Sequence, residues 1–222
     1  MNITEKFLAN NKYSRPGIKL KKVEKLVIHW VANPGTSAMA NRNYFNNLKD
    51  RYASAHYIIG INGEIIQCIP TSEVAYHAGD NKWNSCSIGI ECCHPDWGGQ
   101  FSKATMDSLI ELCAYLCQTF NLDPLKSIFR HYDVTKKDCP RYYVKNPEEF
   151  EKIKEKVKER MYSTGEINLK INGKIRKVKG YVKGGVNYIK IKNYDIPIRD
   201  VGESLGFKVS WDNANKAVVF EM

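Results

Sequence analysis

No stretch of this 222-residue chain approaches the roughly 18 consecutive apolar residues that a membrane-spanning helix needs, so no membrane span is expected. The first residues, MNITEKFLANNKYSRPG, lack a basic segment followed by an apolar run, so the sequence predicts no secretory signal peptide. The chain contains no internal repeat and no low-complexity segment. Hydrophobic residues make up 43% of the chain, which at this length is enough for one good core and a smaller second one.

A disulfide framework is not expected, because the chain has seven cysteines, an odd number, and no predicted signal peptide. Cys113 and Cys117 lie four positions apart in an apolar helical stretch, which favours core packing. Four others are also expected to pack in a β-core, although each is an alternative thiolate for a metal: Cys68, Cys86, Cys92 and Cys93. Cys139 lies in a polar loop before a proline and requires another explanation.

Charge of one sign dominates: 34 Lys and Arg against 24 Asp and Glu give a formal net charge of +10. A nucleic acid is one partner that such a charge attracts. Other anionic polymers are attracted by the same long-range field. A third reading is a surface charge that only favours solubility. Charge does not choose among these readings, and the sequence carries no RNA- or DNA-binding motif.

Apolar patterning predicts strands that alternate with helices in the first part of the chain, which indicates the α/β class. Strands are expected at residues 25–32, in the paired runs of AHYIIGINGEIIQCIP, at 87–93 and at 127–131. Asn62-Gly63 between the paired runs is the strongest short signal of a hairpin. Helices are expected at residues 37–51, at 102–120 with Ser102 as the N-cap, and at 146–161.

The composition changes near residues 162–166, where we place a domain boundary. The first domain is expected to span residues 1–162 and the second residues 166–222. The second domain has short β-like pieces, a helix in IPIRDVGESLG with Gly206 at its C-terminal cap, and a final hairpin. It is therefore expected to be a small α+β domain.

His29, His131 and Cys139 are the candidate metal ligands. His29 lies near the end of a predicted strand beside a turn, and His131 ends another predicted strand. Cys139 follows His131 by eight positions, across the loop YDVTKKD. Two imidazoles and one thiolate suit Zn²⁺, and three protein ligands leave a fourth position open for water, as in catalytic sites. Each residue alone has an ordinary explanation, since single histidines at strand ends are common.

Five segments occur in the order found in one enzyme family: VIHWVA, SAHYIIGINGEIIQCIP, AYHAGD, SIGIECC and RHYDVTKKDCPR. On these segments the chain resembles the type-2 N-acetylmuramoyl-L-alanine amidases, which include phage lysins and peptidoglycan-recognition proteins. The resemblance covers roughly half the chain, from about Lys25 to Arg141. It implies a mixed central β-sheet flanked by helices, with zinc in a surface groove. The family's metal ligands fall on His29, His131 and Cys139.

Glu91 is the candidate general base. It interrupts the apolar strand SIGIECC, where a carboxylate is costly unless it is paired or used. The alternative is a glutamate that faces solvent from an edge strand. Relatives with the SIGIE pattern carry a catalytic glutamate here, whereas other members use a tyrosine immediately before the histidine of the AHY segment. That position is Ala55 in this chain, so the resemblance favours Glu91.

The resemblance assigns a second catalytic role to Lys137, two residues before Cys139. A lysine there stabilises the oxyanion of the tetrahedral intermediate in the family. A fixed cation directed at developing charge makes a large catalytic contribution. The neighbouring Lys136 is an alternative, and a third possibility is that both are solvated loop lysines.

Three further residues are candidates for substrate binding. His77, in AYHAGD, matches a histidine that lines the groove in relatives. His56 is either a groove residue or a buried, hydrogen-bonded core histidine. Asn84, shortly before SIGIECC, is a weaker groove candidate. His94 follows the same strand and either borders the cleft or lies in a surface loop.

The tail contains INGK and IPIRDVGESLGFKVSWDNANKAVVF. On these residues it resembles a small domain first described at the N-terminus of copper amine oxidases and common in clostridial-type wall proteins. No copper chemistry is implied, because the tail has neither histidine nor cysteine. The implied role is cell-wall binding by residues 166–222. Its aromatic residues are expected either to stack on sugar rings or to pack the core: Tyr181, Tyr188, Tyr194 and Trp211.

Together the resemblances predict a zinc-dependent amidase that cleaves the bond between N-acetylmuramic acid and L-alanine in peptidoglycan. The expected lack of a signal peptide fits a phage or prophage endolysin, made in the host cytoplasm and released to the wall through a holin. The alternatives are a non-catalytic peptidoglycan-recognition protein and, from charge alone, a nucleic-acid-binding protein.

The expected partners are peptidoglycan and an anionic cell-wall polymer, with no nucleic acid. The chain is expected to be a monomer or to associate with a free C-terminal domain, made from an internal start at Met161.

Overall fold

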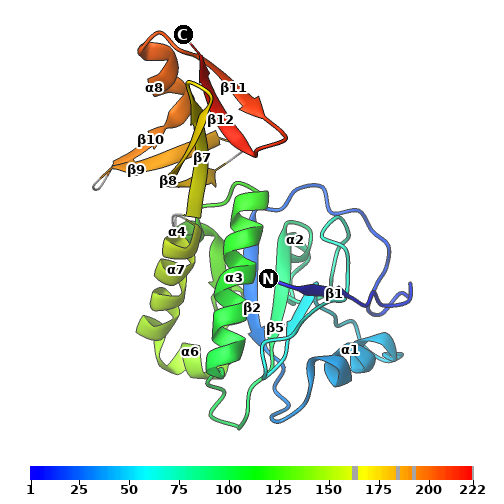
Figure 1. Cartoon of the computed structure of the whole chain (residues 1–222). Coiled ribbons are helices and arrows are strands. Elements are labelled where there is room, and N and C mark those ends of the chain that lie inside the picture. Colours follow the sequence, from blue (N-terminus) through cyan, green and yellow to red (C-terminus); the bar gives the residue numbers. More distant parts are fainter. Residues whose placement is uncertain (162–164, 184–185, 192–193, 222) are drawn as a thin grey trace. The chain divides into compact units, whose positions relative to one another are not determined.

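The computed structural model describes residues 1–161, 165–183, 186–191 and 194–221. The chain forms two compact units, Met1–Arg160 and Met161–Met222, which we call unit 1 and unit 2 (Figure 1). Part of the expected boundary, residues 162–164, lies outside the described residues. A search of the described helices finds none with the length and apolar character that crossing a bilayer requires.

Unit 1 is built on a mixed sheet of six strands in the order β1-β4-β3-β5-β2-β6. In this order the strands are Ile3–Glu5, Ile65–Gln67, Tyr57–Ile59, Ser87–Cys92, Lys25–Trp30 and Ile128–Arg130. Neighbouring strands are parallel except β3 and β4, which form the antiparallel hairpin predicted from Asn62-Gly63. The expected α/β class with a mixed central sheet is therefore confirmed.

The described helices of unit 1 are α1 (Ala38–Asn46), α2 (Asn81–Asn84), α3 (Lys103–Thr119), α4 (Pro124–Ser127), α5 (His131–Thr135), α6 (Arg141–Lys145) and α7 (Pro147–Met161). Helix α3 begins as predicted, with the Ser102 side chain accepting a hydrogen bond from the backbone N–H of Thr105. Helix α1 is shorter than predicted and ends at a pair of asparagines, which are poor helix formers. The predicted loop YDVTKKD begins with α5, because Asp133 caps this helix with Arg130.

Side chains alternate between the two faces of the sheet. His29, Glu91 and Ile58 are register neighbours on β2, β5 and β3, so they share one face. Ile90 points to the opposite face, which α3 covers (Figure 1). The apolar side of α3 is fully or nearly fully buried through Leu109, Leu112, Cys113 and Leu116. The face that carries His29 and Glu91 is therefore separate from the main helix-covered core.

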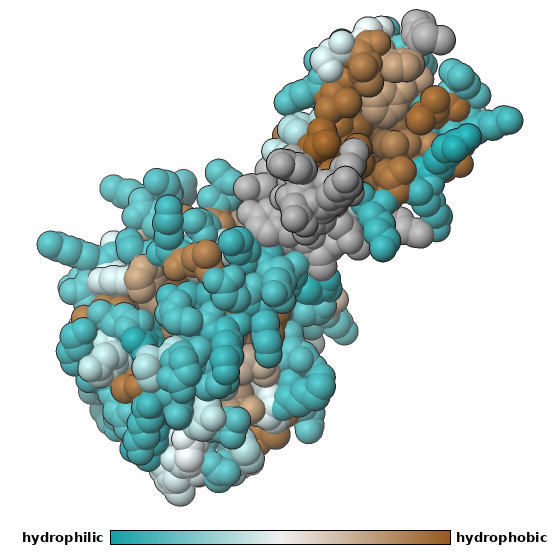
Figure 2. Space-filling view, turned by 90° about the vertical axis from the view of Figure 1, so that its left-hand side faces the viewer, coloured by the Kyte–Doolittle hydropathy of each residue, from teal (hydrophilic) through white to brown (hydrophobic). Residues whose placement is uncertain are grey.

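The cysteines and the outer surface of unit 1 follow the expected distribution. All seven cysteines lie within the described residues and are free thiols, and Cys113 and Cys117 are buried in the core as predicted. The side of unit 1 that carries α6 and α7 is largely hydrophilic in Figure 2. The hydrophilic character of this side is explained by α7, whose exposed residues are mostly lysine and glutamate.

The described residues of unit 2 form a six-stranded sheet in the order β10-β9-β8-β7-β12-β11 and one helix. The bounds are β7 Gly165–Ile171, β8 Lys174–Lys183, β9 Val186–Ile191, β10 Tyr194–Pro197, α8 Ile198–Ser204, β11 Lys208–Asp212 and β12 Ala217–Glu221. The predicted helix and final hairpin are present, and Gly206 has a positive φ of 84° just after α8. The unit has its own apolar cluster, which includes Ile167, Leu169, Ile198, Val209 and Val218.

The aromatic residues of unit 2 differ in exposure. Tyr181 is buried and its ring stacks on Tyr188, with centroids 5.3 Å apart. Trp211 is 46% exposed, and its indole N–H donates to Asn213 Oδ1. The side chain of Tyr194 lies outside the described part of the chain. Trp211 is therefore the more accessible aromatic surface among the three described candidates.

Candidate metal centre and active site

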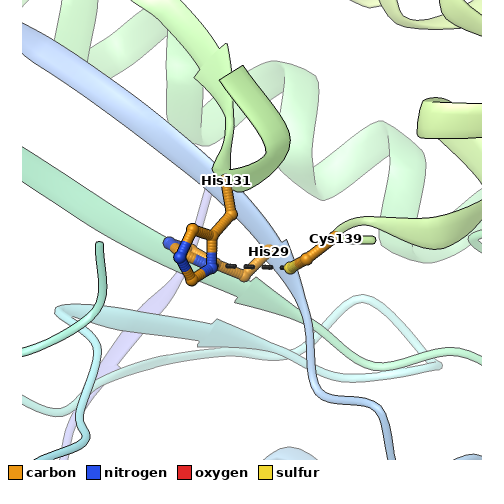
Figure 3. A group of neighbouring side chains, drawn as sticks. All are labelled: His29, His131 and Cys139. Atoms are coloured by element: carbon orange, nitrogen blue, oxygen red, sulfur yellow. Dashed lines mark hydrogen bonds between the residues drawn. The ribbon is translucent and has the colours of Figure 1, made fainter. Parts of the chain in front are cut away.

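Three side chains from distant parts of the chain converge at the carboxyl end of the central parallel strands (Figure 3). His29 lies near the end of β2, His131 directly follows β6, and Cys139 lies beyond α5. The Nδ1 atoms of His29 and His131 are 3.1 Å apart, and Cys139 Sγ lies 3.8 Å from His29 Nδ1. Potential ligand atoms of the three residues all lie within 4.8 Å of one another. The structure thus brings the three predicted ligands together.

These distances fit a tetrahedral zinc ion. With Zn–N near 2.05 Å and Zn–S near 2.3 Å, neighbouring ligand atoms are separated by about 3.4 Å for two nitrogens and about 3.6 Å for nitrogen and sulfur. The observed separations of 3.1 and 3.8 Å are close to these values. The three side chains are at most 6% exposed, so water competes little for their donor atoms. The donor set and its geometry therefore suit zinc.

Burial determines the protonation of this trio. Desolvation lowers the pKa of His29 well below its ordinary value, and nearby His77 and His131 lower it further. Desolvation also lowers the pKa of His131 to about 4, with Lys137 adding to the effect. Both imidazoles are consequently neutral and can offer a lone pair. Burial, assisted by Glu91, raises the pKa of the Cys139 thiol, so metal binding must release its proton.

Local hydrogen bonds connect the segments that supply His131 and Cys139. The backbone N–H of Tyr132 donates to the carbonyl of Cys139 at 2.9 Å, which closes the loop between the two ligands. Arg130 and Asp133 form a capping box at the start of α5, with a side-chain contact of 2.6 Å. These contacts fix the start of α5, and with it the direction of the His131 side chain. The backbone of Trp30 partly opposes the rise in the pKa of the Cys139 thiol.

Glu91 lies on β5, between β3 and β2, so it is not on an edge strand and the alternative reading as an edge residue is wrong. Its Oε2 atom is buried and is one of two buried side-chain polar atoms without a hydrogen-bond partner among the described residues. Burial raises the pKa of Glu91 to about 8, although Lys137 partly opposes this shift. A desolvated carboxyl beside a candidate metal centre is the kind of perturbed group that gathers at active sites.

The two candidate lysines point to different surroundings. Lys136 places its ammonium 5.1 Å from the ring centroid of Tyr132. The charge of Lys137, by contrast, lowers the pKa values of His131 and Glu91. Both lysines are exposed, but the electrostatic contact with the candidate centre belongs to Lys137.

The three candidates for substrate binding are all buried. His56 is fully buried: its Nδ1 accepts the backbone N–H of Gly89, and its Nε2 lies 2.9 Å from the carbonyl of Glu73. These contacts match the alternative of a hydrogen-bonded core histidine. His77 is 7% exposed and lies between His29 and Ser87. Their role in substrate binding stays a prediction.

Asn84 is 6% exposed, and its side-chain oxygen accepts the backbone N–H groups of His77 and Ala78. It also borders a cavity, as described below. His94 is fully buried and stacks on Trp30 with ring centroids 4.6 Å apart, so it is not a surface-loop residue.

Two adjoining cavities share Tyr52 and Tyr76 in their walls. The first, of about 480 Å³, is lined by Tyr52, Tyr76, Gly79, Asn81 and Asn84. Gly79 links this cavity to the neighbourhood of His131, because a Cβ atom on Gly79 would lie 3.6 Å from His131 Nε2. The second, of about 450 Å³, shares Tyr52 and Tyr76 and is also lined by Asn10, Asn11, Lys12, Arg15 and Pro16.

Sequence reasoning missed Tyr52, Tyr76 and Lys12 as candidates. The signal available for the tyrosines was their position beside the SAHY and AYHAGD segments, whereas nothing in the pattern distinguished Lys12. Ser87, the first residue of SIGIECC, was also missed because its partner His77 is distant in sequence.

The chain is similar to known amidases in both sequence and structure. The N-acetylmuramoyl-L-alanine amidase profile matches residues 19–142. The amidase BlyA of Bacillus subtilis (strain 168) is 40% identical over 176 residues, which cover 71% of this chain and 47% of that protein. The chain therefore spans about half the length of the curated relatives it matches.

Two solved structures resemble unit 1. The catalytic domain of XlyA is 30% identical with a TM-score of 0.60, covering 71% of this chain and 99% of that domain. A mutant endolysin from Bacillus subtilis is 31% identical with a TM-score of 0.60, covering 70% and 98%. The profile match contains His29, His131 and Cys139 together with Glu91 and Lys137. From this match and the geometry of the site, the chain belongs to the N-acetylmuramoyl-L-alanine amidase family.

Proposed function

We propose that this chain is a zinc-dependent hydrolase of the amide bond between N-acetylmuramic acid and L-alanine in peptidoglycan, acting as a phage or prophage endolysin. The observation that carries the proposal is the convergence of His29, His131 and Cys139 beside Glu91, inside the part of the chain that matches the amidase family. A non-catalytic recognition protein has less support, because the thiolate ligand Cys139 is present and directed at the two imidazoles.

We assign the catalytic roles to residues of the trio and to two charged residues near it. A zinc ion held by His29, His131 and Cys139 would supply Lewis acidity and lower the pKa of water at its open position. The positive charge of such an ion would favour the ionised form of Glu91. As a carboxylate, Glu91 accepts a proton from the attacking water and returns it to the leaving amine; its Oε2 has no competing partner. Lys137 brings a positive charge to the oxyanion that forms on the substrate carbonyl.

The cavity lined by Tyr52 and Tyr76 is the proposed binding site for the part of the substrate next to the scissile bond. Tyr52 is 64% exposed, and its ring meets the edge of Tyr76 at a centroid distance of 5.4 Å. Aromatic faces of this kind offer apolar surface to sugar rings or peptide side chains. Lys12, exposed on the wall of the second cavity, suits an anionic group such as a stem-peptide carboxylate.

Unit 2 is proposed to bind the cell wall through an anionic polymer. Its separate apolar cluster supports a domain that folds around its own core. The strand β8 exposes several basic side chains, Lys174, Arg176, Lys177 and Lys179. Exposed cations attract a polyanion over the Debye length. Trp211 adds an exposed aromatic surface to the same unit.

The decisive experiment measures both clearing and the bond that is cut. Purified Gram-positive cell walls should lose turbidity when the chain is added, lose this response with a chelator, and regain it with zinc. The released fragments should carry new N-terminal alanine without new reducing sugar ends. Wall binding without clearing would instead support a recognition protein, and new reducing ends would assign a glycosidase. A chain shortened to residues 1–163 tests unit 2: undiminished sedimentation with walls would refute its anchoring role.

A further inference from the structure

A chain of hydrogen bonds runs from the candidate metal centre to a backbone carbonyl. His29 Nε2 lies 3.1 Å from His77 Nδ1, and His77 Nε2 lies 3.2 Å from the hydroxyl oxygen of Ser87. The Ser87 hydroxyl in turn lies 2.6 Å from the carbonyl oxygen of Trp83. His29, His77 and Ser87 are at most 7% exposed, so these hydrogen bonds are shielded from solvent.

The carbonyl of Trp83, at the end of this series of hydrogen bonds, fixes the donor and the acceptor in each of them. A carbonyl only accepts, so the Ser87 hydroxyl donates to Trp83. Ser87 Oγ then accepts from His77 Nε2–H, which leaves His77 Nδ1 as the acceptor for His29 Nε2–H. In a neutral imidazole one nitrogen carries the proton and the other a lone pair. The lone pair of His29 is therefore on Nδ1, the atom that faces His131 and Cys139.

We propose that His77 is a positioning residue that holds His29 in the metal-binding tautomer, with Ser87 as its anchor. The inference rests on the metal site of the proposed function and assigns His77 a role other than contact with substrate. Outer hydrogen bonds to metal-binding histidines fix ring orientation and typically change metal affinity by about 10- to 100-fold. Here the acceptor is a second imidazole, which is itself held by a hydroxyl.

The same short segment also lies beside the second candidate histidine ligand. The backbone of Ala78, next to His77, raises the pKa of His131 and so partly offsets the effect of burial. Asn84 Oδ1 accepts the backbone N–H groups of His77 at 3.1 Å and of Ala78 at 2.8 Å. Asn84 thereby fixes the backbone of the segment that carries His77.

A glycine in β5 makes room for this arrangement. The imidazole of His77 lies against the backbone at Gly89, where a Cβ atom would overlap the ring. The glycine of the SIGIE segment is thus explained by the close approach of His77 to the strand. Gly89 also donates its backbone N–H to His56, so this part of the strand is held from both sides.

The test compares metal affinity in full-length variants of His77. His77→Phe fills the space but removes the acceptor, and we expect zinc to bind about 10- to 100-fold more weakly in a competition with a chromogenic chelator. His77→Asn places an amide oxygen near the position of Nδ1, and we expect it to recover part of the lost affinity. The absorption bands of the Co²⁺-loaded chain should shift in His77→Phe and return toward the native spectrum in His77→Asn.

Ser87→Ala removes the anchor while leaving His77 in place, and it should also weaken zinc binding. Ser54→Ala is the matched control. Ser54 is buried and accepts a hydrogen bond from the backbone N–H of Tyr76, but it takes no part in the hydrogen bonds that link Ser87 to His29. Its loss should lower the melting temperature without changing zinc affinity. If His77→Phe does not fold, the comparison of the two serine variants decides the question.

The inference is overturned if His77→Phe or Ser87→Ala binds zinc within twofold of the native chain and keeps its Co²⁺ spectrum. A raised KM with unchanged zinc affinity would overturn it too, because it would place His77 in the substrate groove. Failure of the native chain itself to bind zinc is a different result, which would refute the proposed function.

Discussion

His29 and Glu91 are register partners on adjacent parallel strands, so a candidate metal ligand and a candidate proton acceptor leave the same face of the sheet one strand apart. Neighbouring strands in a sheet lie about 4.8 Å apart. This spacing leaves room for a metal ion and one bound water between the two side chains. His131 reaches the same place from the end of β6, on the other side of β2. The central parallel strands therefore set the spacing of the site.

Replacing Cys139 with serine should remove the thiolate while preserving the size of the side chain. We expect zinc affinity to fall by at least about 100-fold and wall clearing to be lost, because zinc prefers the softer sulfur donor. Chelator competition measures the affinity. Cys86→Ser is the control, since Cys86 is half-buried, hydrogen-bonded to the Lys82 carbonyl and outside the trio. Native zinc affinity in Cys139→Ser would remove Cys139 from the ligand set.

Glu91→Gln should separate metal binding from turnover. The amide keeps the shape of the carboxyl but cannot shuttle a proton, so we expect kcat to fall by about 10²- to 10⁴-fold while zinc remains bound. Fragment release from walls gives the rate, and zinc content per chain gives the occupancy. Unchanged rates in the variant would exclude Glu91 as the general base.

The same residue should give the metal-free chain a characteristic dependence on pH. Its folded pKa of about 8 lies above its ordinary value of 4.5, so the folded state binds the proton more tightly than the unfolded state. Its contribution to stability is greatest below the unfolded pKa and is lost as pH rises through the folded pKa.

Melting temperatures of chelator-treated chains at pH 5 and pH 8 test this expectation. The native chain should lose on the order of 5 °C more than Glu91→Gln over this interval, because the amide does not titrate. Comparing the two chains cancels the contributions of the histidines. Equal losses would show that Glu91 is not desolvated in the folded protein.

The adjacent lysines provide a matched pair. Lys137→Ala should lower kcat by about 10²- to 10³-fold, because it removes a cation directed at the oxyanion. Lys136→Ala should leave the rate near native, since its ammonium lies over the ring of Tyr132. Steady-state rates on a soluble muramoyl peptide measure both. A larger loss in Lys136→Ala would reverse the assignment.

Tyr52→Ala tests the proposed cavity. Loss of its exposed ring should raise KM for wall fragments by about 10-fold, with a smaller effect on kcat, because it removes contact area beside the reacting bond. Tyr44→Ala is the control, as Tyr44 is 48% exposed on α1 and lines neither cavity. Equal KM values for the two variants would place the substrate elsewhere.

The sequence was most informative where chemistry and local signals coincide. The hairpin at Asn62-Gly63 and the helix after Ser102 have short-range causes, so both were predictable. The ligand trio was identified because histidine and cysteine are rare enough that motif order singles them out, and the structure brings them together.

Other features depend on partners that are distant in the chain. The ring of His77 is bonded to His29, 48 positions away, and no local pattern shows which nitrogen of either ring carries the proton. The three-residue strand β1 is too short for a visible alternation, and its place beside β4 comes from tertiary pairing. Helix α5 was hidden because its two capping residues were assigned to different elements: Arg130 to the predicted strand 127–131 and Asp133 to the polar loop after it.

The separation of the ligands along the chain has a consequence for when activity can arise. His29 and Cys139 are 110 positions apart. A ribosome that has not yet passed residue 139, or a protease that has cut off the segment carrying it, leaves a product with at most two donors for the metal. Such incomplete products therefore lack the complete group of His29, His131 and Cys139.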